Sequence, residues 1–148
     1  MNYWFECKVS YERQADSMGM KKVSESYLVD ALSFTEAEKR IIKEVRPFVS
    51  VGELEVVNIR RARIAELFLS DESEDDRYFR AKVNFITVDE KSGSEKKTSA
   101  TMIVKSDSLP NAVTELKAQL DSQMASYEIA AVTDTQILDV FQYEAPEK

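Results

Sequence analysis

The chain has 148 residues, a formal net charge of −7, 43% hydrophobic residues and 32% charged residues, an ordinary composition for one compact globular domain. It has no histidine and one cysteine, Cys7, which excludes an internal disulfide, a Cys–His nucleophile and the usual zinc sites. The acidic balance argues against a protein that coats duplex DNA by bulk charge, and no apolar run is long enough to span a membrane. We therefore expect a cytoplasmic protein without a cofactor, a metal or a membrane partner.

Residues 2–12 alternate between apolar and polar side chains, which predicts a half-buried strand. A polar connection leads to a short apolar run at 27–29, which predicts a second buried or half-buried strand. We expect a helix from about 35 to 46, and two further strands at about 53–59 and 62–69. The predicted order is strand, strand, helix, strand, strand.

The predicted helix carries apolar residues at spacings of three and four, the signature of one buried face: Phe34, Ala37, Ile41, Val45 and Phe48. Ser33 and Thr35 are each followed three positions later by a glutamate, so two overlapping capping boxes mark the helix start. Pro47 limits the helix, because the residue before a proline avoids the helical region.

The second half of the chain repeats this pattern. Residues 23–37 align without gaps on 98–112, and the helix stripe is copied so that Ile41 corresponds to Leu116. Chance similarity between two generic strand–helix patterns is the alternative explanation. The repeat predicts a helix and four strands, at about 109–123, 78–85, 98–105, 127–132 and 135–143.

These patterns predict an α+β fold. We expect a tandem, pseudo-two-fold repeat of a strand-strand-helix-strand-strand unit, forming an antiparallel sheet with two helices on one face. The chain, 1–148, is expected to be a single domain with repeats at about 2–69 and 77–143. The segment 70–76 is acidic and has no apolar residue, which predicts a linker between the repeats. An interaction tail or a metal-binding loop is the alternative for this segment.

The first candidate site is the sheet face turned away from the core. We expect it to carry Trp4, Lys8, Tyr78, Arg80 and Lys82. Aromatic rings with nearby cations suit single-stranded DNA or RNA, whose bases stack and whose phosphates pair with cations. The ordinary alternative is that outward strand positions are often basic, and that a tryptophan near a terminus seals a core edge or a dimer interface.

The second candidate is the arginine cluster Arg60, Arg61 and Arg63 between the third and fourth strands. Forked guanidinium groups can bind phosphate or carboxylate groups. The cluster has no counterpart in the second repeat, and charge pairing with the acidic linker is the simpler explanation. We include all three arginines in the predicted nucleic-acid site.

The carboxylates are numerous but scattered, and the sequence contains no phosphate-binding glycine loop, nucleophile elbow or metal-ligand spacing. We therefore expect no catalytic residues and no enzymatic activity. The predicted function is a small binding protein for single-stranded nucleic acid. The alternative is a protein–protein interaction module or a homodimer, because an aromatic N-terminal strand at a sheet edge can pair with another chain.

The run Tyr-Leu-Val-Asp-Ala at 27–31 is followed by Ser-Phe-Thr-Glu-Ala at 33–37. Together with blocks at 3–8, 82–87 and 139–141, these runs resemble a family catalogued only as a domain of unknown function, found in gut-type bacteria and their phages. The resemblance implies a small, soluble, non-enzymatic protein of phage or mobile-element origin, and it brings no binding residues with it. In architecture alone, a tandem repeat with a free sheet face is also similar to single-strand-binding folds.

Overall fold

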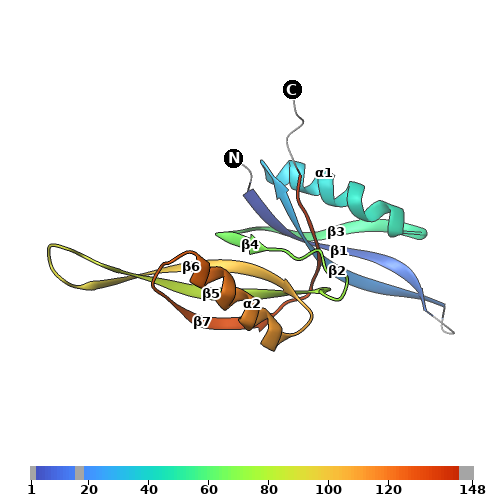
Figure 1. The fold of residues 1–148 in the computed structure, drawn as a ribbon. Helices are drawn as coiled ribbons and strands as arrows, with labels where there is room; N and C mark the ends of the chain where they lie inside the picture. Colours follow the sequence, from blue (N-terminus) through green and yellow to red (C-terminus); the bar gives the residue numbers. More distant parts are fainter. Residues whose placement is uncertain (1–2, 16–18, 144–148) are drawn as a thin grey trace, which may run out of the picture. The chain divides into compact units, whose positions relative to one another are not determined.

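The structure is a computed structural model that describes residues 3–15 and 19–143 (Figure 1). The α+β class is confirmed, and the elements follow the predicted order twice. Their bounds are β1 Tyr3–Ala15, β2 Gly19–Ala31, α1 Phe34–Val45, the 3-10 turn η1 Arg46–Phe48, β3 Val51–Ala62, β4 Glu66–Phe68, β5 Arg77–Val88, β6 Glu95–Ser106, α2 Leu109–Ser122, β7 Tyr127–Asp134 and β8 Ile137–Phe141.

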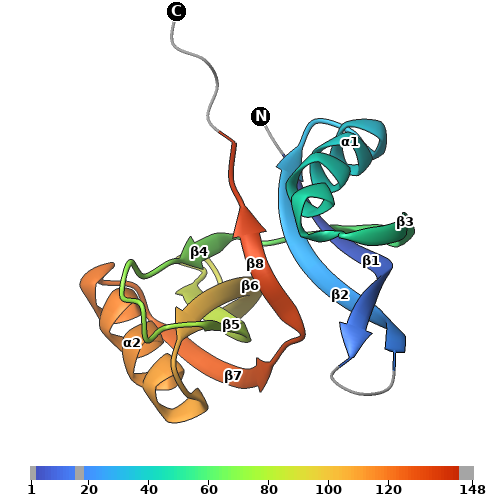
Figure 2. The same cartoon turned by 90° about the vertical axis from the view of Figure 1, so that its right-hand side faces the viewer.

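The strands form two four-stranded sheets instead of the single antiparallel sheet that the sequence predicts. Their orders are β3-β1-β2-β8 and β4-β6-β5-β7. The long hairpins β1–β2 and β5–β6 are the centres of the two sheets, and no described strand pairs one hairpin with the other. Each sheet has its own helix, with α1 packed on β1–β3 and α2 on β6 and β7 (Figures 1 and 2).

The last strand of each predicted repeat pairs in the other half of the chain. β8 lies parallel to β2, and β4 lies parallel to β6, so each sheet contains one parallel pair. The chain accordingly divides into unit 1, Met1–Arg63 with Gln136–Lys148, and unit 2, Ile64–Thr135. The units therefore do not coincide with the repeats, and the acidic segment 70–76 lies within unit 2, between β4 and β5.

The central strands β2 and β6 are each buried on both faces over part of their length. Tyr27–Ala31 on β2 and 102–104 on β6 are buried at every position, although strands with one solvent-facing side alternate. β8 and β4 satisfy backbone groups along the edges of β2 and β6 that the hairpins leave unpaired.

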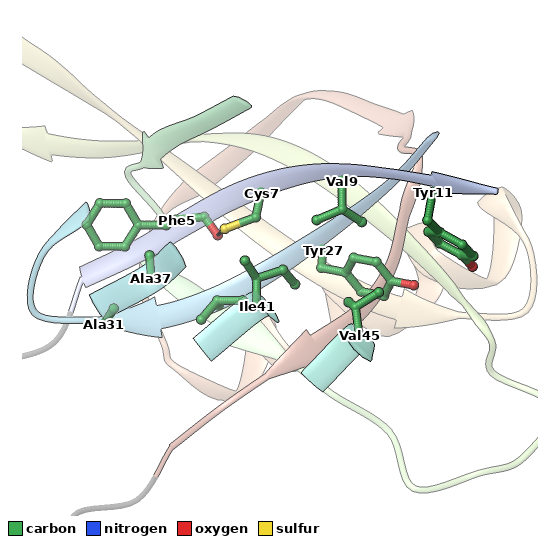
Figure 3. Close-up of a cluster of buried hydrophobic side chains, with 10 residues drawn as sticks. Phe5, Cys7, Val9, Tyr11, Tyr27, Ala31, Ala37, Ile41 and Val45 are labelled. Carbon is green, nitrogen blue, oxygen red and sulfur yellow. Dashed lines mark hydrogen bonds between the residues drawn. The ribbon is translucent and has the colours of Figure 1, made fainter. Parts of the chain in front are cut away.

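Each helix covers a separate apolar core. In unit 1, the inward face of β1 meets the buried stripe of α1, as Figure 3 shows for Phe5, Val9 and Ile41. The corresponding cluster of unit 2 contains Phe79 and Leu116. Ile41 and Leu116 are both fully buried, as the repeat predicts.

The helix boundaries refine the sequence prediction. The Ser33 hydroxyl accepts the Glu36 N–H at 3.2 Å, so Ser33, the first of the two candidate residues, caps the helix. α1 ends at Val45, and the η1 turn that contains Pro47 follows. Phe48 therefore leaves the helical stripe and is 68% exposed, and Phe34 at the start of the helix is 53% exposed, so the assignment of both to the core is wrong.

The outer edges of both sheets are irregular or short. β3 pairs with β1 with a break in register at Lys8/Val9, where Val57 is the extra residue. β7 pairs with β5 with a similar break at Lys82/Val83. The opposite edges are formed by β4 and β8, which have three and five residues.

No helix in the described part of the chain has the length and apolar character needed to cross a membrane.

Candidate binding surfaces

The outward face of β1 carries two of the predicted site residues, Trp4 and Lys8. Trp4 is half-buried and Lys8 is exposed, while the alternate positions of the strand point into the core of unit 1. On the neighbouring strand β3, Arg60 lies opposite Glu6, and Asn58 lies opposite Lys8. The sheet therefore brings Trp4, Lys8 and Arg60 together on one face. Alternation predicts this for Trp4 and Lys8, whereas Arg60 was expected between two strands and lies within β3.

The three arginines at the end of β3 do not form one cluster. Arg60 donates to the Glu6 carboxylate at 2.8 Å, so its charge is paired within the sheet. Arg61 points to the opposite face, where its guanidinium carbon lies 3.9 Å from the centre of the Tyr3 ring. Arg63 follows the strand and is exposed. Arg60 thus finds its counter-charge in Glu6, and Arg61 is held by an aromatic ring.

The remaining predicted residues lie on β5 in unit 2. Lys82 is exposed and Arg80 is half-buried, but Tyr78 is only 4% exposed. Its backbone carbonyl accepts the Thr135 hydroxyl at 2.7 Å, and the Lys105 ammonium lies 5.8 Å from the centre of its ring. The expectation of an outward, exposed Tyr78 ring is therefore wrong, because strand alternation gives the direction of a side chain but not what covers it.

Sequence reasoning missed a groove of about 560 Å³ in unit 1. It is formed by β1, β2, the end of α1, η1 and β8, the strand contributed by the second repeat. Its apolar and aromatic lining residues are Tyr11, Tyr27, Pro47, Phe48, Leu138 and Phe141. Figure 3 shows Tyr11 and Tyr27 on the Val45 side of the core.

Two tyrosines fix a carboxylate in this groove. The hydroxyls of Tyr11 and Tyr27 donate to the same oxygen of Glu25, Oε1, at 2.6 and 3.0 Å. Burial, and secondly the nearby Glu25, raises the pKa of both tyrosines above the ordinary value. Both hydroxyls therefore stay protonated near neutral pH and hold Glu25 in one orientation.

A second carboxylate is fixed in the same way. The Tyr143 hydroxyl donates to Glu44 Oε1 at 2.7 Å, and burial together with this bond raises the pKa of Tyr143 to about 12. The Arg40 guanidinium carbon lies 4.0 Å from the centre of the Tyr143 ring. Glu44 thus belongs to an ordered polar network at the groove.

Carboxylates outnumber cations along the groove. Among its described lining residues, Glu25, Glu44 and Asp139 carry carboxylates and Arg13 carries a guanidinium. The Tyr27 and Phe141 rings are stacked, with their centres 5.5 Å apart and an angle of 23° between the planes. The arrangement suits a ligand with apolar surface and positive charge.

Metal chemistry has no candidate centre in this structure: among residues 3–15 and 19–143, no group of three or more Cys, Asp or Glu side chains could hold a metal ion.

Residues 3–143 match the family described as "Domain of unknown function (DUF4494)", and the chain belongs to this family. Comparisons with curated proteins and with solved structures give no significant match.

Proposed function

We propose that this member of the DUF4494 family is a non-enzymatic interaction module that binds a segment of another protein in the unit 1 groove. The observation that carries the proposal is the groove itself. Its volume of about 560 Å³ lies within the roughly 300–1,000 Å³ of typical ligand sites, and its lining combines apolar walls with a few oriented polar groups. The proposal includes the cytoplasmic location expected from the sequence.

Two apolar side chains supply the anchor surface. Phe48 is 68% exposed and Leu138 is 51% exposed, and both line the groove. Fully burying such a side chain is worth about 1.5–3 kcal/mol, so covering both is a substantial contribution to binding. The groove therefore favours a protein segment that brings its own apolar residues.

The test is a selection from a random dodecapeptide library against the full chain. Peptides that are enriched should bind in isothermal titration calorimetry, and Leu138→Asp should abolish their binding. Val88→Asp is the matched control, because Val88 is an exposed apolar residue of unit 2 outside the groove. If no peptide is enriched, or if both variants bind equally well, the proposed site is wrong.

Single-stranded nucleic acid is the second candidate, and the shared face of Trp4, Lys8 and Arg60 favours it. Base stacking on one aromatic ring is worth about 1–3 kcal/mol, so binding should be weak and sensitive to salt. Fluorescence anisotropy of a labelled oligothymidine at low salt tests this candidate, with Trp4→Ala and Lys8→Glu as site variants and Lys43→Glu on α1 as the control. Absence of binding at about 100 μM protein would exclude it.

A further inference from the structure

We infer that the unit 1 groove selects a basic segment, in which an arginine or lysine follows or precedes an apolar residue. This inference rests on the proposed function and adds the chemistry of the occupant. The apolar residue would cover Phe48 and Leu138, and the cationic group would lie at Glu25 and Glu44.

The first argument is the orientation of the carboxylates. Both tyrosine hydroxyls donate to Oε1 of Glu25, and no described side chain donates to its other oxygen, Oε2. Glu44 is held in the same manner, with the Tyr143 hydroxyl on Oε1. Each carboxylate thus keeps one oxygen for an incoming N–H donor. Because their positions are already fixed, binding loses less side-chain freedom than it would with mobile carboxylates.

The second argument is the aromatic surface beside these carboxylates. The stacked Tyr27 and Phe141 rings line the groove, and a guanidinium or ammonium group is attracted to an aromatic face. Unit 1 already uses this contact within its own chain, where Arg40 lies over Tyr143 and Arg61 lies over Tyr3. The alkyl part of a long basic side chain would also cover apolar surface.

The third argument concerns which ligands the groove excludes. The fixed carboxylates of Glu25 and Glu44 oppose phosphate groups and acidic peptides, so nucleic acid is not the occupant of this surface. Arg13 is the one cation among the described lining residues, and it opposes a basic ligand. Removing the Arg13 charge should therefore strengthen binding, which is the opposite of the effect expected from removing the charge of Glu25.

The experiment uses the peptides selected against the full chain. They should contain arginine or lysine at a fixed position, and replacing arginine by citrulline, which has the same shape without the charge, should weaken binding about tenfold or more. Glu25→Gln should weaken binding of the arginine peptide by a similar factor and abolish the discrimination against citrulline. Arg13→Gln should tighten binding several-fold. The glutamine at position 25 can still accept both tyrosine hydrogen bonds, and an unchanged thermal melt would verify that the fold is kept.

The outcomes separate this inference from the proposed function. If the selected peptides are uncharged but lose binding in Leu138→Asp, the groove is a binding site and the inference of a basic occupant is overturned. If citrulline and arginine peptides bind equally, it is overturned as well. If no peptide depends on Leu138, both the inference and the proposed function fail.

Discussion

Replacing Leu116 in unit 2 by alanine should destabilise unit 1, although the reverse experiment should spare unit 2. Unit 2 is one continuous segment, Ile64–Thr135, whereas unit 1 is assembled from two segments that flank it. When unit 2 unfolds, residues 64–135 become a flexible loop that unit 1 must close to keep β8 beside β2. When unit 1 unfolds, unit 2 loses no connection of its own.

The magnitude follows from burial and loop length. Leu116 is fully buried, and truncating such a leucine costs about 2–5 kcal/mol, of which the better helix propensity of alanine returns a few tenths. Closing a loop of residues 64–135 costs about 4 kcal/mol of chain entropy. The free energy of unfolding falls by about 1–3 kcal/mol per molar urea. A loss of this size should therefore lower the urea midpoint of the Trp4 transition by about 1 M or more.

The assay uses the one tryptophan of the chain. Trp4 lies in unit 1, so its fluorescence reports that unit, while far-UV circular dichroism reports both. The wild type should show coincident transitions, and Leu116→Ala should move both to lower urea. Ile41→Ala in unit 1 should lower the Trp4 transition, while hydrogen exchange of α2, β5 and β6 stays slow. If the wild-type transitions coincide but the Trp4 midpoint is unchanged in Leu116→Ala, the loop-closure argument is refuted. It is also refuted if the amides of both units exchange at the same rate in Ile41→Ala.

Three further predictions follow from single side chains. The pKa of Tyr27 and of Tyr143 is raised in the folded state, to about 12 for Tyr143, so the unfolded chain loses these protons first and the free energy of unfolding should fall as the pH rises above about 10. Urea unfolding at increasing pH measures this fall, and it should be shallower in Tyr27→Phe. An identical fall in Tyr27→Phe would contradict the raised pKa of Tyr27. Cys7 is buried and its pKa is raised to about 12 by burial, so a thiol reagent should modify it only after unfolding, and rapid reaction of the native protein would count against its placement. Ser33→Ala should cost about 0.5–2 kcal/mol because it removes the cap of α1, while Thr35→Ala should be close to neutral; equal losses in thermal melts would show that the two capping boxes are used alike.

Local periodicity predicted the helices and strands, but it did not predict which strands pair with β4 and β8, the last strand of each repeat. The stripes around Ile41 and Leu116 identified both helices and their buried faces, because helix amphipathicity depends only on nearby residues. The run at 27–29 indicated a buried strand, and all three of its residues are buried. Nothing in the pattern of β4 or β8 distinguishes pairing within a repeat from pairing in the other unit, since either arrangement buries the same alternate residues.

The same limit applies to the candidate sites. Alternation along β1 correctly placed Trp4 and Lys8 on one face. It failed for Tyr78, whose burial depends on what covers the sheet. The groove escaped prediction because Phe48 continues the helical spacing in the sequence, and only the early end of α1 turns it outward. The sequence offered one signal that Phe48 lies outside the helix, namely Pro47 directly before it.

The edges of the two sheets have a consequence for how the protein behaves at high concentration. A long, regular edge strand is a template on which further strands can add, and this is a common route to fibrils. Here the two longer edges, β3 and β7, are each interrupted by an extra residue, and the two remaining edges are only three and five residues long. Among the strands of residues 3–15 and 19–143, backbone templating therefore has no long, uninterrupted edge to start from. At high concentration the protein should therefore stay in solution without forming fibrils through these edges.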